Sequence, residues 1–124
     1  MVDSSVSISP VTRPSRAIPE WIRLMLCVRA GGRCEFDGCN EYLFEHRLTL
    51  REGTFGQVAH IVAFSEAGPR GADGPRPQDI NDVGNLMLLC PGCHKLIDDH
   101  PADFSKASLV AHKDAHEQRV LYLT

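Results

Sequence analysis

The stretch Asn85–His100, NLMLLCPGCHKLIDDH, decides the fold because it places a metal-binding motif at the start of a helix. A short apolar segment leads into Cys90 and Cys93, and His94 follows directly. Closely spaced cysteines of this kind are typical of zinc sites. The stretch therefore predicts a metal-binding turn followed by a helix. It leaves open whether the turn only holds the domain together or also belongs to a site that performs chemistry.

The chain has 124 residues, which is the usual size of one domain. It is 43% hydrophobic, and no apolar run approaches the roughly 20 residues that span a bilayer. The first residues lack the basic and then apolar order of a signal peptide. We therefore expect a cytoplasmic protein with no membrane partner. In a reducing compartment, its five cysteines are expected to be metal ligands or catalytic groups more often than disulfides.

The two short-spaced cysteine pairs predict one structural zinc site. Each pair supplies two thiolates from one turn, and the 50 residues between the pairs fold back to bring them together. A closed site of four cysteines leaves zinc no open position, so this zinc is expected to stabilise the fold. Two unrelated pairs or a redox Cys-x-x-Cys are the alternatives. The expected ligands are Cys34, Cys39, Cys90 and Cys93, whereas Cys27 is expected to be a buried small residue.

The rest of the chain predicts a small α+β domain. Residues 1–19 are rich in Ser, Pro and Thr and are expected to be a flexible lead-in, so the domain covers residues 20–124. A Gly/Pro-rich loop at 65–82 is long enough to be functional or mobile. The expected elements are a helix from about 20 to 30, a hairpin-like pair of strands near 48–51 and 56–62, a helix from about 94 and a second helical region from about 102.

Three polar residues complete the pattern. His60 lies in the apolar segment QVAHIVAF, Asn85 precedes the second cysteine pair, and His94 follows that pair. The motifs CEFDGC, VAHI and GNLMLLCPGCHKLID, in this order, resemble the zinc-stapled branch of the HNH endonuclease family. The resemblance spans about residues 34–98. It implies a ββα-metal core, in which two strands and a helix surround one divalent ion.

The resemblance gives each polar residue a role. His60 matches the general base that deprotonates the attacking water, Asn85 the residue that orients the catalytic loop and His60 or supports the metal, and His94 a metal ligand. The chain departs from the common pattern at Ala59, where many relatives have a second metal ligand. Asp98 is the candidate substitute, because residues four apart share one face of a helix. The implied cofactors are a structural Zn²⁺ and a catalytic Mg²⁺ or other divalent ion.

The sequence is also similar to a narrower group, the nuclease domains of bacterial CBASS anti-phage effectors with a SAVED sensor domain. This resemblance implies a nuclease that degrades double-stranded DNA with little sequence preference. It also implies a SAVED sensor domain after residue 124 in the full-length chain, activation by a cyclic oligonucleotide, and a homo-oligomer on activation. Arg70, Arg76 and Lys95 lie near the expected site and are candidate phosphate contacts.

Two other functions stay open. The formal charge of -3 argues against nucleic-acid binding over the whole surface, because phosphate contacts normally come from Lys and Arg. A zinc-stapled module that binds DNA or protein without chemistry would fit this charge and the alanine at 59. A redox thiol protein would require reversible oxidation of Cys90 and Cys93. Five arginines in residues 1–33, against Asp3 and Glu20, still allow a local basic face.

Overall fold

The structure is a computed structural model that describes residues 17–123. Most of the predicted lead-in at 1–19 lies outside the described residues. The fold class is α+β, as expected, with a two-stranded sheet and three α-helices among the described residues. No helix in this part of the chain is long and apolar enough to cross a membrane. The elements are α1 (Glu20–Ala30), β1 (Gln57–His60), the 3-10 helix η1 (Val83–Asn85), β2 (Leu86–Leu89), α2 (Pro91–Asp99) and α3 (Lys106–Leu123).

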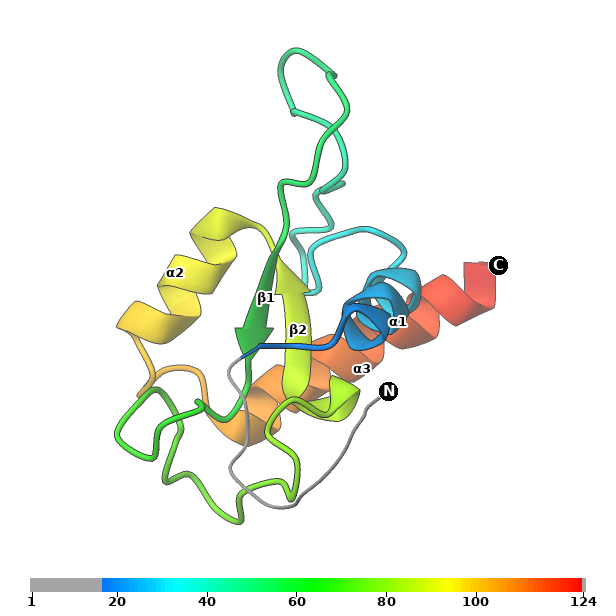
Figure 1. Cartoon of the computed structure of the whole chain (residues 1–124). Coiled ribbons are helices and arrows are strands. Elements are labelled where there is room, and N and C mark those ends of the chain that lie inside the picture. The colour runs from blue at the N-terminus through cyan, green and yellow to red at the C-terminus, as the bar shows by residue number, and fades with distance from the viewer. Residues whose placement is uncertain (1–16, 124) are drawn as a thin grey trace.

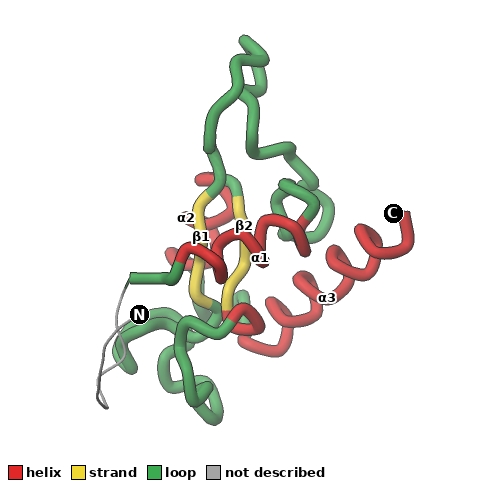
Figure 2. Tube along the Cα trace, turned by 45° about the vertical axis from the view of Figure 1, so that its right-hand side comes forward, coloured by secondary structure: helices red, strands yellow, loops and turns green. Residues whose placement is uncertain are grey.

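The sheet lies between helices on both sides. Strands β1 and β2 pair antiparallel, with Gln57 opposite Leu89 and His60 opposite Leu86. Helix α2 lies on one side of this pair, and α1 lies on the other with α3 beside it (Figures 1 and 2). All four residues of β2 are buried, because helices cover both of its faces. The apolar run Leu86–Leu89 of the opening stretch is therefore the fully buried strand of the sheet.

The predicted strand at 48–51 is wrong. This segment forms the tip of a long excursion between Cys39 and β1, which rises from one end of the sheet (Figure 1). The tip is a turn, in which the amide of Leu50 donates to the carbonyl of His46 at 2.8 Å. The true partner of β1 is β2, because the fully buried run of β2 offers apolar contacts that a solvent-exposed segment cannot. The predicted strand near 56–62 is confirmed at Gln57–His60.

Helix α1 forms where it was predicted. Gly31 ends it in a left-handed conformation (φ +63°), which glycine adopts without a steric penalty. Apolar residues occur on both faces of α1, and only one face meets the core. Trp21, Leu24 and Val28 are exposed, whereas Ile22, Leu26 and Ala30 are buried.

A buried polar cluster ties α3 to the sheet. The Glu35 side chain accepts a hydrogen bond from the amide of Leu88 in β2 at 2.9 Å, and Lys113 of α3 lies 3.8 Å from the same oxygen. Lys113 also pairs with Glu117 at 2.6 Å. Burial, and then the neighbouring Glu117 carboxyl, raise the pKa of Glu35 to about 9. Burial thus favours the protonated form of Glu35, whereas the nearby Lys113 acts in the opposite direction.

Candidate functional site

Four cysteines converge at the end of the sheet where α2 begins. The sulfur atoms of all four lie within 4.8 Å of one another, and Cys39 Sγ lies 4.0 Å from Cys90 Sγ. Four thiolates at 2.3 Å from a tetrahedral zinc ion are about 3.8 Å apart. All are free thiols rather than disulfides, so the donor set and its spacing fit zinc. The cluster consists of Cys34, Cys39, Cys90 and Cys93.

The start of α2 prepares the second cysteine pair for this role. Cys90 is the N-cap residue of the helix, and its sulfur accepts a hydrogen bond from the amide of Cys93 at 3.3 Å. Burial acts to raise the pKa of Cys90, but this amide and the neighbouring thiols lower it overall. Burial raises the pKa of Cys34 to about 12. A thiol this buried needs a cation nearby to ionise, and bound zinc supplies one.

A separate pocket of about 340 Å³ brings together three of the predicted site residues. His60 enters it from the end of β1, and His94 and Asp98 enter it from α2. The loop after β1 closes the other side with Ala63, Phe64, Ser65, Gly68 and Pro69. The first and last of these residues, His60 and Asp98, are more than 30 positions apart in the sequence. The pocket exists because β1 and α2 lie side by side.

His60 is held by an asparagine that the sequence analysis missed. Its Nε2 lies 2.8 Å from Oδ1 of Asn81. A carboxamide oxygen only accepts hydrogen bonds, so Nε2 bears the proton in this contact. Nδ1 is therefore the ring atom of His60 that is left to act as a base. No motif marks Asn81, which is one polar residue among several in its loop.

Asn85 is the last residue of η1, and its side chain bonds to backbone groups. Its side chain is buried, accepts from the amide of Val62 at 3.0 Å, and donates to the carbonyls of Val62 and Ile80 at 3.1 and 2.9 Å. These bonds join the segment just after β1 to the chain just before η1. Asn85 thus fixes the loop that follows His60, whereas Asn81 contacts His60 itself.

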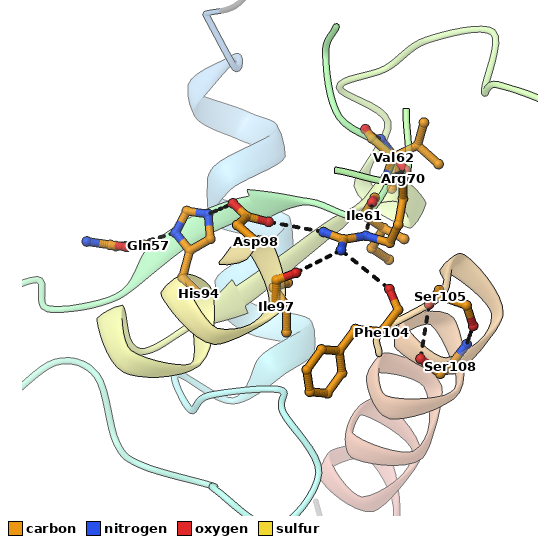
Figure 3. A network of polar contacts seen from close by, with 11 residues as sticks. Gln57, Ile61, Val62, Arg70, His94, Ile97, Asp98, Phe104, Ser105 and Ser108 are labelled. Carbon is orange, nitrogen blue, oxygen red and sulfur yellow. Dashed lines mark hydrogen bonds and ion pairs between the residues drawn. The ribbon is translucent and has the colours of Figure 1, made fainter. Parts of the chain in front are cut away.

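His94 and Asp98 form the second half of the pocket (Figure 3). His94 Nδ1 lies 2.8 Å from Oε1 of Gln57, and His94 Nε2 lies 3.1 Å from Oδ2 of Asp98. With Nδ1 donating to Gln57, the Nε2 lone pair faces a carboxylate oxygen. Two acceptors at this distance need a proton or a cation between them.

The spacing of these two atoms fits a divalent cation. Neighbouring ligands at about 2.1 Å from an octahedral Mg²⁺ are about 3.0 Å apart. Mg²⁺ keeps several waters and binds through one or two protein groups plus a substrate phosphate. Ala59 adds no ligand, because its methyl side chain has no donor atom; it is also buried, on the opposite face of β1 from Val58 and His60, which line the pocket. His94 and Asp98 are therefore the pair in this pocket that could hold a divalent ion.

A comparison with protein families shows which family the chain belongs to. The model described as HNH endonuclease matches residues 34–101, which is more than half of the chain. The chain belongs to the HNH endonuclease family. The matched residues include all four cysteines and the pocket residues His60, His94 and Asp98. A search of curated proteins found no match.

Arg70 connects this pocket to the interior. Its side chain is 1% exposed, and it donates to the carbonyls of Ile61, Ile97 and Phe104 at 2.6, 3.0 and 3.4 Å (Figure 3). It also donates to Oδ1 of Asp98 at 3.1 Å, which leaves Oδ2 for His94. Because the guanidinium is enclosed and occupied, we do not propose a phosphate contact for Arg70. Its observed contacts join the loop after β1 to α2 and to the start of α3.

Replacement of Arg70 with alanine is expected to lower the free energy of unfolding by about 1–3 kcal/mol, because buried carbonyls lose their hydrogen-bond donor. The change would leave buried carbonyls and one oxygen of Asp98 without their hydrogen-bond donor. Urea unfolding of zinc-loaded protein measures it. The matched control is Arg47→Ala, which removes an exposed arginine and should change the free energy by less than about 0.5 kcal/mol. Equal stability of the two variants would contradict the interior role of Arg70.

The other two candidate phosphate contacts differ in exposure. Arg76 folds back on its own loop and donates to the carbonyls of Ala63, Phe64 and Gly71 at 2.7–3.1 Å. Lys95 is 78% exposed and pairs with Asp99 at 2.8 Å on the surface of α2. An exposed pair of this kind contributes little to stability and exchanges easily with another anion. Lys95 is thus the one of the three predicted cations that is open to a phosphate.

Proposed function

We propose that this chain is a divalent-metal-dependent endonuclease that hydrolyses phosphodiester bonds of double-stranded DNA. One observation carries the proposal: a histidine held by an asparagine and a histidine–carboxylate pair share one pocket in a member of the HNH endonuclease family. Phosphodiester hydrolysis needs an activated water, a cation near the developing charge and fixed geometry. The pocket offers a residue for each need.

In the proposed mechanism, His60 acts as the general base. Its Nδ1 takes a proton from a water molecule while the water oxygen attacks phosphorus and the bond to the leaving oxygen breaks. The hydrogen bond from Nε2 to Asn81 keeps the ring oriented before and after the proton transfer. A positioned base of this kind accelerates such a reaction by about 10²–10⁴-fold.

His94 and Asp98 would hold the catalytic ion. When bound, a divalent cation stabilises the charge that develops on the phosphate and leaving oxygens. Gln57 accepts from Nδ1 of His94 and so directs its Nε2 lone pair toward the ion site. Arg70 holds the other oxygen of Asp98 and fixes the direction of the carboxylate. Two zinc ligands, Cys90 and Cys93, lie at the start of the same helix, so bound zinc would position its first turn. Four cysteine ligands leave zinc no open position for substrate.

The proposed substrate is double-stranded DNA cut with little sequence preference. Few of the pocket-lining residues could read base edges, and most are apolar or glycine. The resemblance to CBASS effectors supports the further proposal that the chain acts in anti-phage defence in the cytoplasm. In that setting, a SAVED sensor domain of the full-length protein would bind a cyclic oligonucleotide and drive assembly of a homo-oligomer.

Cleavage of a substrate panel tests the proposed activity. Supercoiled plasmid, circular single-stranded DNA and a structured RNA of equal mass are incubated with the protein in Mg²⁺, Mn²⁺ or Ni²⁺. The plasmid should be nicked and then linearised at many positions, with no cleavage when the divalent ion is omitted. Faster cleavage of RNA than of plasmid would contradict the assignment of substrate, and cleavage at one unique plasmid position would contradict the lack of preference.

A binding module without chemistry is the second candidate function. The net charge of -3 and the pair of protein ligands in the pocket, with Ala59 unable to add a third, favour it. This function requires that DNA or protein binding be insensitive to added Mg²⁺. It also requires that no member of the panel be cleaved when the parent protein is activated.

A further inference from the structure

A projecting loop has features that neither the zinc site nor the pocket explains. We call residues 44–55 the finger. The finger rises beyond the zinc end of the sheet, away from α1 and α3, and returns to enter β1 (Figures 1 and 2). An isolated antiparallel β-bridge between Glu45 and Glu52 closes its stem. Its tip therefore stands apart from the core and does not contribute to it.

The tip is an ordered turn built around His46. Nδ1 of His46 accepts from the amides of Leu48 and Thr49 at 3.2 and 3.1 Å. Its backbone amide donates to the carbonyl of Arg51 at 2.8 Å, and its carbonyl accepts from the amide of Leu50. These four bonds hold the five residues 47–51 in one conformation. Side chains on such a tip are presented to a partner at a small entropic cost.

Two leucines project from this turn into solvent. Leu48 is 77% exposed and Leu50 is 64% exposed. Leu50 also has a positive φ of 61°, a backbone conformation that favours Gly or Asn. A turn that served only to connect strands would place a polar residue or glycine there. An apolar side chain kept at an unfavourable, solvent-exposed position indicates contact with a partner.

Two arginines flank the leucines and indicate the kind of partner. Arg47 and Arg51 are both exposed. Among residues 17–123, neither side chain has an ion pair or side-chain hydrogen bond. Arg47 and Arg51 flank the two leucines in the sequence, and exposed guanidiniums are groups that bind DNA phosphates. Apolar wedges between such cations are a common way to enter the minor groove.

The finger is also placed to reach DNA that occupies the pocket. It leads directly into Gln57, whose side chain contacts His94. The run from Leu50 to His60, the β1 residue that carries the proposed base into the pocket, spans at most about 36 Å, which is close to one DNA turn of about 34 Å. A duplex with one phosphodiester in the pocket could therefore meet the finger about one turn away.

We propose that the finger is a second DNA contact, in which Arg47 and Arg51 bind phosphates and Leu48 and Leu50 enter the minor groove. The proposal rests on the proposed function, because it names the surface by which the same site holds its substrate. It predicts that the finger contributes to DNA affinity and leaves the chemical step at bound DNA unchanged. The pocket and the finger can therefore be tested separately.

The test measures the affinity of the zinc-loaded protein for a fluorescent 30-base-pair duplex without added divalent metal, across a range of salt concentrations. The double variant Arg47→Ala, Arg51→Ala should bind about 10-fold more weakly. Loss of two phosphate contacts should also reduce the slope of log affinity against log salt by about 1.8. The matched control Arg23→Ala, Arg29→Ala removes two exposed arginines from α1 and should leave the slope unchanged.

The leucines are tested by Leu48→Ala combined with Leu50→Gly. Glycine accepts a positive φ, so this variant keeps the turn, and its circular dichroism and zinc content should match the parent. We expect affinity to fall about 5-fold with no change in the salt slope, because no cation is removed. The cleavage rate at saturating plasmid should stay within about twofold of the parent rate for both finger variants.

Unchanged affinity and salt slope in the arginine variant would overturn the finger proposal. Absence of measurable DNA binding by the parent, or tighter binding to phosphatidylglycerol vesicles than to DNA, would also overturn it. The two proposals fail separately. If the parent cleaves plasmid and the finger variants bind DNA normally, the finger proposal fails and the nuclease proposal stands. If the finger variants bind DNA more weakly and the parent never cleaves, the nuclease proposal fails and the finger proposal stands.

Discussion

His60→Ala is expected to lower the rate of plasmid cleavage by about 10²–10⁴-fold while leaving the fold and the zinc content intact. In the proposed mechanism, the variant removes the side chain that takes the proton from the attacking water. His60 is at the end of β1 and is partly exposed, so its loss creates no large cavity in the core. The single-turnover rate at saturating plasmid measures the effect.

Two comparisons make this result specific. Free imidazole should restore part of the activity of His60→Ala, because it can enter the vacated space and accept the proton. The matched control is His100→Ala, which removes an exposed histidine just after α2 and should cleave at the parental rate. A His60→Ala variant that cleaves normally would remove His60 from the mechanism.

Cys90→Ser is expected to abolish the folded state at 25 °C. Zinc binding by four thiolates contributes about 10–16 kcal/mol to folding in small zinc domains. A domain of this size has a total stability of about 5–15 kcal/mol, so loss of the site exceeds what the core can supply. Cys90 also caps α2 and lies in the core beside β2. We expect loss of bound zinc by elemental analysis and loss of the cooperative unfolding transition by circular dichroism.

Cys27→Ser is the matched control for the zinc prediction. Cys27 is a free thiol of α1 outside the four-cysteine cluster, so its replacement should keep one zinc per chain and a cooperative transition. A strong chelator should unfold the parent and this control alike. If the parent stayed folded after complete removal of zinc, the zinc would not be the staple that the sulfur geometry indicates.

The zinc site was predictable because its ligands are short-range pairs. Cys-x-x-Cys before a helix fixes two ligands by local geometry alone, and only the pairing of the two turns depends on the rest of the chain. The helix at 20–30 was also predictable from local signals, since Gly31 ends it. Which face of that helix meets the core was not, because apolar residues occur on both faces.

Strand pairing and the second partners of the site residues depend on tertiary contacts. The sequence predicted a hairpin with 48–51 because those residues are close along the chain, whereas β1 pairs across 25 residues with β2. The contact of His60 with Asn81 likewise joins residues 21 positions apart through a loop without a regular period. Arg70 was interpreted as a surface cation because only the fold reveals the carbonyls that surround it.

Mn²⁺ binding to the zinc-loaded protein tests the central claim most directly, namely that His94 and Asp98 hold a divalent ion separate from the structural zinc. Electron paramagnetic resonance measures free Mn²⁺ during titration. We predict one Mn²⁺ per chain for the parent and at least about 10-fold weaker binding for His94→Ala and for Asp98→Ala, with zinc retained in all three. Absence of Mn²⁺ binding by the parent, or equal binding by the parent and both variants, would contradict the account.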